Sequence, residues 1–367
     1  MFKKERKNRP DYFLAIIIFA LVMFGLIVIY SVSKYYSLQI TDGVTDKYYL
    51  NKQLISLLLG LVAWAIFQNI DYRHWQKNSK YMFYATFGLL LLPLLFGGSR
   101  WIGFGWAVFQ PAELAKLTMI FYLAGYFADR ENAREIQKSS MKFFVFVGAI
   151  ALLMLVQKDL GTLSVFVGIS GIMFLMAGAP YLHLFYGGGL AGFLLWLSIK
   201  IEPYRMHRLT AFLNPGEDTL GTGYHIRNAL IAIGSGGVLG LGFGQSKQKY
   251  LYLPEAHTDS IFAIIAEELG FLRTSVIIIA FCLVALRGYK IAKNAPDTFS
   301  KLTAVGITSW LVWQAFVNIG AMLSIVPLTG IPLPFISYGG SSLIILLAAT
   351  GVLLNISKYS TLYEKAK

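Results

Sequence analysis

The sequence is short of charge and of cysteine. Only 14% of its 367 residues are charged, whereas soluble domains average about 25%. Hydrophobic residues make up 56% and include 27 phenylalanines. The single cysteine, Cys282, lies in a hydrophobic run, so an intrachain disulfide is excluded and redox chemistry indicates no compartment. These deficits exclude an ordinary soluble domain and predict a polytopic membrane protein.

Negative charge is scarce as well, with 19 acidic residues against 32 basic ones and a net charge of +13. Such an excess could indicate nucleic-acid binding. Most of the basic residues, however, lie in segments between hydrophobic runs that would share one side of a membrane. The positive-inside rule assigns these segments and both termini to the cytoplasm. The charge therefore predicts topology and no nucleic-acid partner.

Hydrophobic runs of about 20 residues, the length that crosses a bilayer, recur along the chain. The first is too long for the core of a signal peptide and predicts a retained span. We predict an all-α polytopic protein with one domain over 1–367 and a large outer loop at 201–258, between spans seven and eight. Spans five and six could be one broken span. Ten spans are expected near 12–33, 48–69, 78–97, 111–129, 142–157, 160–178, 180–200, 259–287, 301–325 and 336–357.

Unusual charges gather on the predicted outer face. Glu113 and Lys116 share one face of the fourth span at i,i+3 spacing, where they could act in a site or form a structural ion pair. Asp159 and Asp259 each open a hydrophobic run, which suits either a functional carboxylate or a helix cap. Arg100 lies in the loop before the fourth span. The outer face is therefore where we expect polar chemistry.

Other polar residues have open interpretations. His257 fits a hydrogen-bonding loop residue better than a metal ligand, because no second His or Cys lies nearby. Glu267 and Glu268 fall deeper in the eighth span, where one could pair with another helix and the other face a cavity. The cluster Arg205, His207 and Arg208 could be a solvated or headgroup-facing surface. No cofactor follows from the sequence, although a divalent cation, Mg or Mn, stays open.

The glycine-rich run 234–244 superficially suggests a nucleotide-binding loop. It lacks the strand–turn–helix setting and the Lys-Ser/Thr ending that a phosphate loop needs. It would also lie outside, where ATP is scarce. We expect its glycines to let the chain turn close to a ligand or to the membrane surface.

An enzyme on the outer face needs a substrate that carries its own activation. A polyprenyl diphosphate-linked sugar has its lipid tail in the bilayer and its sugar outside. Transfer of that sugar requires cations for the diphosphate and a carboxylate to deprotonate the attacking hydroxyl. The outer face offers both kinds of group.

Distinctive motifs lie at 100–103, 109–116, 159–162, 214–225, 231–237, 254–259 and 330–341. Together they resemble the SEDS family (shape, elongation, division, sporulation), which includes RodA, FtsW and SpoVE. The similarity covers nearly the whole chain, and two segments, 245–254 and 332–342, resemble FtsW more than RodA. The family usually has proline where this chain has Lys158.

This resemblance implies a peptidoglycan glycosyltransferase of the bacterial cytoplasmic membrane that polymerises lipid II. Its expected partners are lipid II, the growing glycan strand, membrane lipid and a class B penicillin-binding transpeptidase. We expect Asp259 to be the general base of an inverting transfer, since a diphosphate departs without a protonating acid. The groups expected to bind substrate or shape the electrostatics are Arg100, Glu113, Lys116, Asp159, His257 and Ser341.

Two hypotheses from other classes stay open. A lipid II flippase would place functional charges near the bilayer midplane on broken helices, and Glu267, Glu268 and Arg273 favour it. A non-catalytic scaffold of the cell-wall synthesis machinery would tolerate neutral substitutions of the outer-face carboxylates. An assay for polymer and for translocation with labelled lipid II separates the three.

Overall fold

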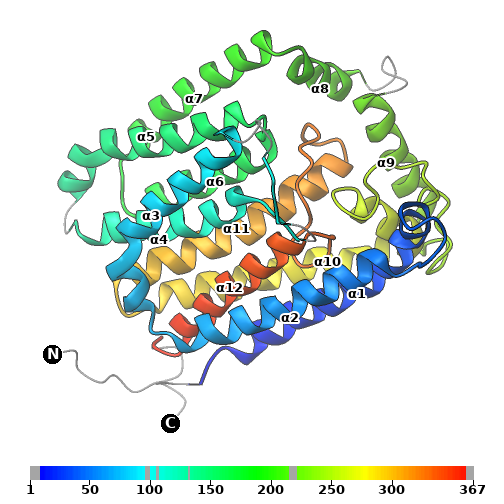
Figure 1. Cartoon of the computed structure of the whole chain (residues 1–367). Coiled ribbons are helices and arrows are strands. Elements are labelled where there is room, and N and C mark those ends of the chain that lie inside the picture. The colour runs from blue at the N-terminus through cyan, green and yellow to red at the C-terminus, as the bar shows by residue number, and fades with distance from the viewer. Residues whose placement is uncertain (1–8, 96–99, 105–106, 131–132, 215–220, 361–367) are drawn as a thin grey trace.

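Long helices dominate the computed structural model of the chain, which describes residues 9–95, 100–104, 107–130, 133–214 and 221–360 (Figure 1). The first seven helices are α1 (Tyr12–Ile40), α2 (Tyr48–Asn69), α3 (Tyr72–Leu95), α4 (Pro111–Ala128), α5 (Ala133–Val156), α6 (Leu160–Met176) and α7 (Tyr181–Ile201). They are followed by α8 (Pro203–Leu213), α9 (Thr222–Gly236), α10 (Ile261–Lys293), α11 (Thr298–Met322) and α12 (Gly340–Ser357).

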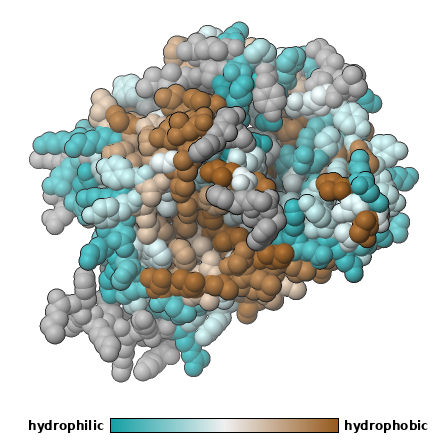
Figure 2. Space-filling view, viewed as in Figure 1, coloured by the Kyte–Doolittle hydropathy of each residue, from teal (hydrophilic) through white to brown (hydrophobic). Residues whose placement is uncertain are grey.

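The predicted all-α polytopic class is confirmed. Each predicted span falls on a long helix, and α5 and α6 are separate helices joined by a turn at 157–159. Among the described residues, five helices are long and apolar enough to cross a membrane: α1, α2, α10, α11 and α12. Figure 2 shows hydrophobic side chains over the middle of the face in view and hydrophilic ones toward both ends.

Regular structure between the spans was missed by sequence reasoning. The segment 201–258, predicted as a loop, contains α8 and α9. Pro203 at the start of α8 was an available signal, because proline suits the first helical turn. A short antiparallel pair, β1 (Ile102–Phe104) and β2 (Ala107–Phe109), precedes α4.

The first and last helices meet at one end of the bundle. The backbone N–H of Asp11, the N-cap of α1, donates to Ser357 Oγ at 3.0 Å. The Asp11 carboxylate accepts a hydrogen bond from Arg287 Nη2 at 2.6 Å. Both ends of the described chain therefore lie on the same side of the bundle. The basic residues of 1–8 and 361–367 that helped to predict the topology lie outside the described residues.

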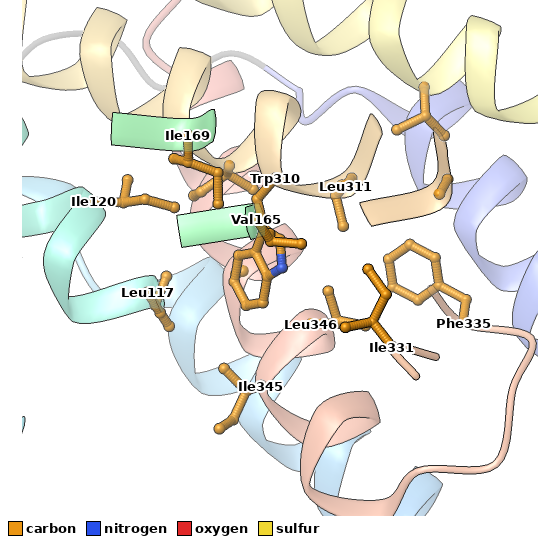
Figure 3. Close-up of a cluster of buried hydrophobic side chains, with 14 of the residues drawn as sticks. Leu117, Ile120, Val165, Ile169, Trp310, Leu311, Ile331, Phe335, Ile345 and Leu346 are labelled. Carbon is orange, nitrogen blue, oxygen red and sulfur yellow. The ribbon is translucent and has the colours of Figure 1, made fainter. Parts of the chain in front are cut away.

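The hydrophobic core is centred on α11. Trp310 is fully buried and is surrounded by aliphatic side chains from α4, α6 and α12 (Figure 3). Ile331 and Phe335, from the connection between α11 and α12, lie in the same cluster (Figure 3). The second half of this irregular connection (323–339), residues 331–337, is thus packed into the interior of a helical protein, whereas the half nearer α11 is largely exposed.

Helix α10 is broken at Gly270, whose φ of 74° and ψ of 176° are not helical. The loop after α9 bonds to the broken ends. The carbonyls of Glu267 and Glu268 accept from the N–H groups of Leu241 and Gly242, both at 3.0 Å. The N–H groups of Phe271 and Leu272 donate to the carbonyls of Gly237 and Val238, at 2.9 and 3.1 Å. The break therefore leaves these backbone groups satisfied, as an apolar environment demands.

The glycines of the 234–244 run serve this contact. A Cβ at Gly236 or Gly240 would collide with the backbone of α10, and one at Gly270 would collide with Gly240. Gly236 and Gly240 therefore permit a close backbone-to-backbone contact with α10. The expectation that the glycines of this run allow approach to a ligand or to the membrane surface stays a prediction.

We predict that Gly270→Ala destabilises the protein by about 1–3 kcal/mol or more, because its backbone conformation is essentially restricted to glycine and the new methyl would meet Gly240. Thermal unfolding of detergent-purified protein measures this. Gly234→Ala is the matched control, since no atom lies within 4 Å of its Cβ position. Equal melting temperatures for the two variants would contradict the packing argument.

Candidate functional site at the outer carboxylates

Asp259 lies in the turn that leads into α10 and is buried, with 7% of its surface exposed. It is not the helix cap that its position suggested. Ser260 occupies the N-cap, and no side chain makes a capping bond there. The Asp259 carboxylate instead accepts the hydroxyl of Thr258 at 3.2 Å. Its Oδ2 faces Gly330, where a Cβ would lie 3.6 Å away.

The pKa of Asp259 is raised to about 7, chiefly by burial, which disfavours the charged form. The negative charge of Glu255 raises it further, while Arg208 lowers it. Glu255 is exposed, and its Oε2 accepts the same Thr258 hydroxyl at 2.8 Å. A buried carboxyl that titrates near neutral pH can accept a proton from a reacting group.

Asp159 is the N-cap of α6, and it also joins a polar cluster. Its Oδ1 accepts the N–H of Thr162 at 3.1 Å. Its Oδ2 accepts Gln110 Nε2 at 2.7 Å, and Arg100 lies 3.8 Å from Oδ1. Arg100 is 42% exposed whereas Asp159 is 2% exposed. The guanidinium of Arg100 is therefore accessible at the protein surface while Asp159 orients it from below.

The backbone beside Asp159 differs from what the family's usual proline at position 158 would allow. Lys158 has a φ of 58°, which a proline ring cannot adopt. Its ammonium lies 3.4 Å from Glu202, just before α8. The turn between α5 and α6 therefore has a conformation that the residue usual in the family would exclude.

Glu113 and Lys116 form a buried ion pair with Nζ 2.7 Å from Oε1. Lys116 also donates to Gln314 Oε1 at 3.1 Å and lies 4.8 Å from the ring centre of Trp310. Both charged side chains are almost fully buried. Of the two roles open from the sequence, this geometry favours mutual charge balance over contact with a substrate.

His257 is enclosed by three tyrosine rings. The ring centres of Tyr49, Tyr36 and Tyr338 lie 4.3, 5.0 and 5.6 Å from its own. Burial lowers the pKa of His257 to about 4, so the imidazole is neutral. Its carbonyl accepts the N–H of Tyr338 at 2.9 Å. Ser341 lies half-buried in the first turn of α12, three residues further along.

Helix α8 brings the basic cluster of the outer segment to the site. Arg205 is buried and donates to the carbonyl of Leu155 at 2.8 Å, so it is not a solvated surface residue. Arg208 donates to the carbonyl of Leu328 at 3.2 Å and lies close enough to Asp259 to lower its pKa. Sequence reasoning left Arg208 out of the site because its charge looked like ordinary surface charge.

Glu267 and Glu268 are buried and face the loop after α9. Glu268 forms an ion pair with Lys249 at 2.9 Å, and Glu267 accepts the hydroxyl of Ser246 and the N–H of Lys247. Arg273 is exposed and donates to the carbonyl of Leu239 at 3.4 Å. These charges stabilise the helix break and its loop.

The predicted residues form linked pairs. Arg100 meets Asp159, Glu113 meets Lys116, and Asp259 shares a turn with His257. In the described parts of the chain, no three of His, Cys, Asp and Glu converge as a metal site requires.

The chain matches known proteins over nearly its full length. The model of a family described as "Cell cycle protein", named for FtsW, RodA and SpoVE, matches residues 12–362. Stage V sporulation protein E of Bacillus subtilis is 42% identical over 97% of the chain and 99% of its own length. A probable peptidoglycan glycosyltransferase FtsW of Geobacter metallireducens is 38% identical over 97% of both chains.

Solved structures share the fold. A chain from a structure described as "Structural coordination of polymerization and crosslinking by a peptidoglycan synthase complex" superposes with a TM-score of 0.76 at 27% identity, covering 95% of this chain and 97% of its own. The rod shape determining protein RodA of Thermus thermophilus superposes with a TM-score of 0.70 at 27% identity, over 96% of this chain and 98% of its own.

We predict that Glu255→Gln lowers the pKa of Asp259 below about 7, because it removes a neighbouring negative charge that raises it. Asp259 would then stay ionised to lower pH. The measurement is labelling of Asp259 by a hydrophobic carbodiimide, which reacts with the protonated carboxyl, followed by mass spectrometry across pH. Glu202→Gln, which removes an outer glutamate paired with Lys158, is the control. An unchanged midpoint in Glu255→Gln would contradict the electrostatic assignment.

Proposed function

The chain belongs to the family of FtsW, RodA and SpoVE, and from that premise we propose that it is a peptidoglycan glycosyltransferase. In this proposal it polymerises lipid II on the outer face of the bacterial cytoplasmic membrane. Relatives named as probable peptidoglycan glycosyltransferases support the activity. The geometry around Asp259 supports the assignment of the base.

The observation that carries the proposal is the buried carboxylate of Asp259, which lies in the turn before α10 with its Oδ2 toward Gly330. Burial raises the pKa of this carboxyl to about 7. In the transfer, a sugar hydroxyl of the acceptor loses its proton to Asp259 as its oxygen attacks the anomeric carbon of the donor. The bond from that carbon to the diphosphate breaks, and the diphosphate leaves with the electron pair. Attack opposite the leaving group inverts the anomeric centre. One positioned base of this kind contributes about 10²–10⁴-fold.

The leaving diphosphate needs positive charge, and Arg100 and Arg208 are the cations that we assign to it. Arg100 is half exposed beside Asp159, and Arg208 lies in the electrostatic field of Asp259. Lys116 is enclosed by Glu113, Gln314 and Trp310, so we assign it to charge balance.

Arg100→Gln should lower turnover more than folded yield, and an equal loss of both would remove Arg100 from the site.

The proposed partners follow the same chemistry. The lipid tail of the donor lies in the bilayer, and the growing glycan strand supplies or receives the sugar outside. The solved peptidoglycan synthase complex that shares this fold is described as coordinating polymerization and crosslinking. A class B penicillin-binding transpeptidase is therefore the partner that we propose. We retain the resemblance to FtsW over RodA as a proposal for a role in division.

The transporter hypothesis gains one feature that it predicted, the break of α10 at Gly270 beside the buried Glu267 and Glu268. The transporter hypothesis relied on Glu267, Glu268 and Arg273, and all three now have partners in the loop after α9. A scaffold would not need a buried carboxylate that titrates near neutral pH. Polymer formation by purified protein separates a glycosyltransferase from both.

Asp259→Asn should abolish polymerisation of labelled lipid II by purified protein while leaving the melting temperature near that of the wild type. The amide is nearly isosteric but cannot accept the proton. Wild-type turnover should rise with pH through about 7, since only the ionised carboxylate acts as a base. Asp297→Asn is the control, because Asp297 caps α11 and asparagine also caps helices. Polymerisation by Asp259→Asn near the wild-type rate would return the search to Asp159 and Glu113.

The orientation of the chain in the membrane is tested separately. A reporter that is active only in the cytoplasm should be active after Lys367, because the positive-inside rule assigns both termini to that side. An alkaline phosphatase inserted near Glu217 should be active outside. The opposite pair of signals would put every proposed catalytic group in the wrong compartment.

A further inference from the structure

We propose that Asn318, a buried asparagine of α11, is a positioning residue for Asp259, and that Gln314 extends this role to the Glu113–Lys116 pair. The inference rests on the proposed function. It assigns a task to two carboxamides and to an ion pair that would not themselves touch the substrate.

Asn318 joins two segments that are distant in sequence. Its Nδ2 donates to the carbonyl of Asp259 at 2.7 Å and to the carbonyl of Ile331 at 2.8 Å. The side chain is 1% exposed. A carboxamide nitrogen has two hydrogens, so both are used. The amide therefore ties the backbone of the base to the connection between α11 and α12.

These two hydrogen bonds of Asn318 determine what the carboxylate of Asp259 faces. Gly330 immediately precedes Ile331, and its Cβ position lies 3.6 Å from Asp259 Oδ2. Gly330 has a φ of 70°, a conformation that favours glycine. The carboxylate thus lies against bare backbone whose location is fixed by the same amide. Displacing residue 331 would displace the surface against which the base rests.

Gln314 lies one turn before Asn318 on the same face of α11. Its Nε2 donates to the carbonyl of Pro332 at 2.9 Å, next to the carbonyl that Asn318 binds. Its Oε1 accepts Lys116 Nζ at 3.1 Å and Trp310 Nε1 at 2.8 Å. The ion pair therefore fixes the orientation of Gln314, and Gln314 fixes the connection beside Asp259.

Loss of the hydrogen bonds made by Asn318 has two consequences. Two buried carbonyls lose a donor, which costs stability wherever it happens. Misplacement of a catalytic group by about 1 Å can additionally cost about 10²-fold in rate. A merely structural asparagine would produce only the first effect, so the two can be separated.

Asn355 provides a matched control. It is also 1% exposed, and it bridges two backbone groups at the opposite end of the bundle. Its Oδ1 accepts the N–H of Tyr72 at 3.0 Å, and its Nδ2 donates to the carbonyl of Gln68 at 2.8 Å. Asn318→Leu and Asn355→Leu should both lower the melting temperature of the purified protein.

Only Asn318→Leu should reduce polymerisation of lipid II per folded molecule, by about 10- to 100-fold. It should also move the pH midpoint of carbodiimide labelling at Asp259 downward, because a released carboxyl regains solvent. The charged groups that act on Asp259 are Glu255 of its own loop and Arg208 of α8. The buried imidazoles of His257 in that loop and His225 of α9, which contacts Ser260, are the other titratable groups nearby.

If Asn318→Leu does not fold, Asn318→Ser, which can donate to one carbonyl, takes its place with the same expected direction. The inference is overturned if the Asn318 variant keeps its activity per folded molecule and its labelling midpoint, or if Asn355→Leu changes both equally. Failure of the wild type to polymerise lipid II would instead contradict the proposed function. The labelling midpoint needs no turnover, and it would still decide whether Asn318 positions Asp259.

Discussion

The site depends on a segment of buried backbone that is not helical, because the polar groups of such a segment need hydrogen-bond partners. Residues 331–337 of the connection between α11 and α12 run through the interior without intrahelical hydrogen bonds, and their polar groups must find other partners. Arg208, Asn318 and Gln314 bind the carbonyls of residues 328, 331 and 332. Gln53 of α2 binds the carbonyl of Ser337 and the N–H of Gly339. Two of these side chains also act on Asp259, since Asn318 binds its carbonyl and Arg208 lowers its pKa. Folding of this segment and assembly of the site therefore share part of one set of bonds.

The charged groups around the candidate site differ in how deeply they are buried. Glu113 and Lys116 form a buried ion pair in which each charge balances the other. Removing one partner of such a pair is costly because the other charge is left buried without compensation. Arg100 keeps nearly half of its surface exposed while it is oriented from beneath by Asp159. Buried charges thus fix the framework, and partly exposed ones remain able to meet an anion.

Much of this arrangement follows from the sequence. Long apolar runs between basic segments predicted the helices, because each run must satisfy its backbone internally. The carboxylates at the starts of runs identified Asp159 and Asp259 as special. The break at Gly270 was not predictable, since the apolar run continues through it and a lone glycine is tolerated in helices. The roles of Gln314, Asn318 and Arg208 were hidden too, because their partners lie far away in the chain and no local pattern encodes such contacts.

The meeting of the first and last helices has a consequence for biogenesis. Asp11 caps α1 and binds Arg287 of α10 and Ser357 of α12. Helix α2 packs along α12 as well, with Gly351 set against the backbone of Trp64. Helices α1 and α2 contact each other, but their contacts with α10 and α12 can form only after those later segments have been synthesised. A chain that stops before α12 would leave α2 without the surface along which it packs.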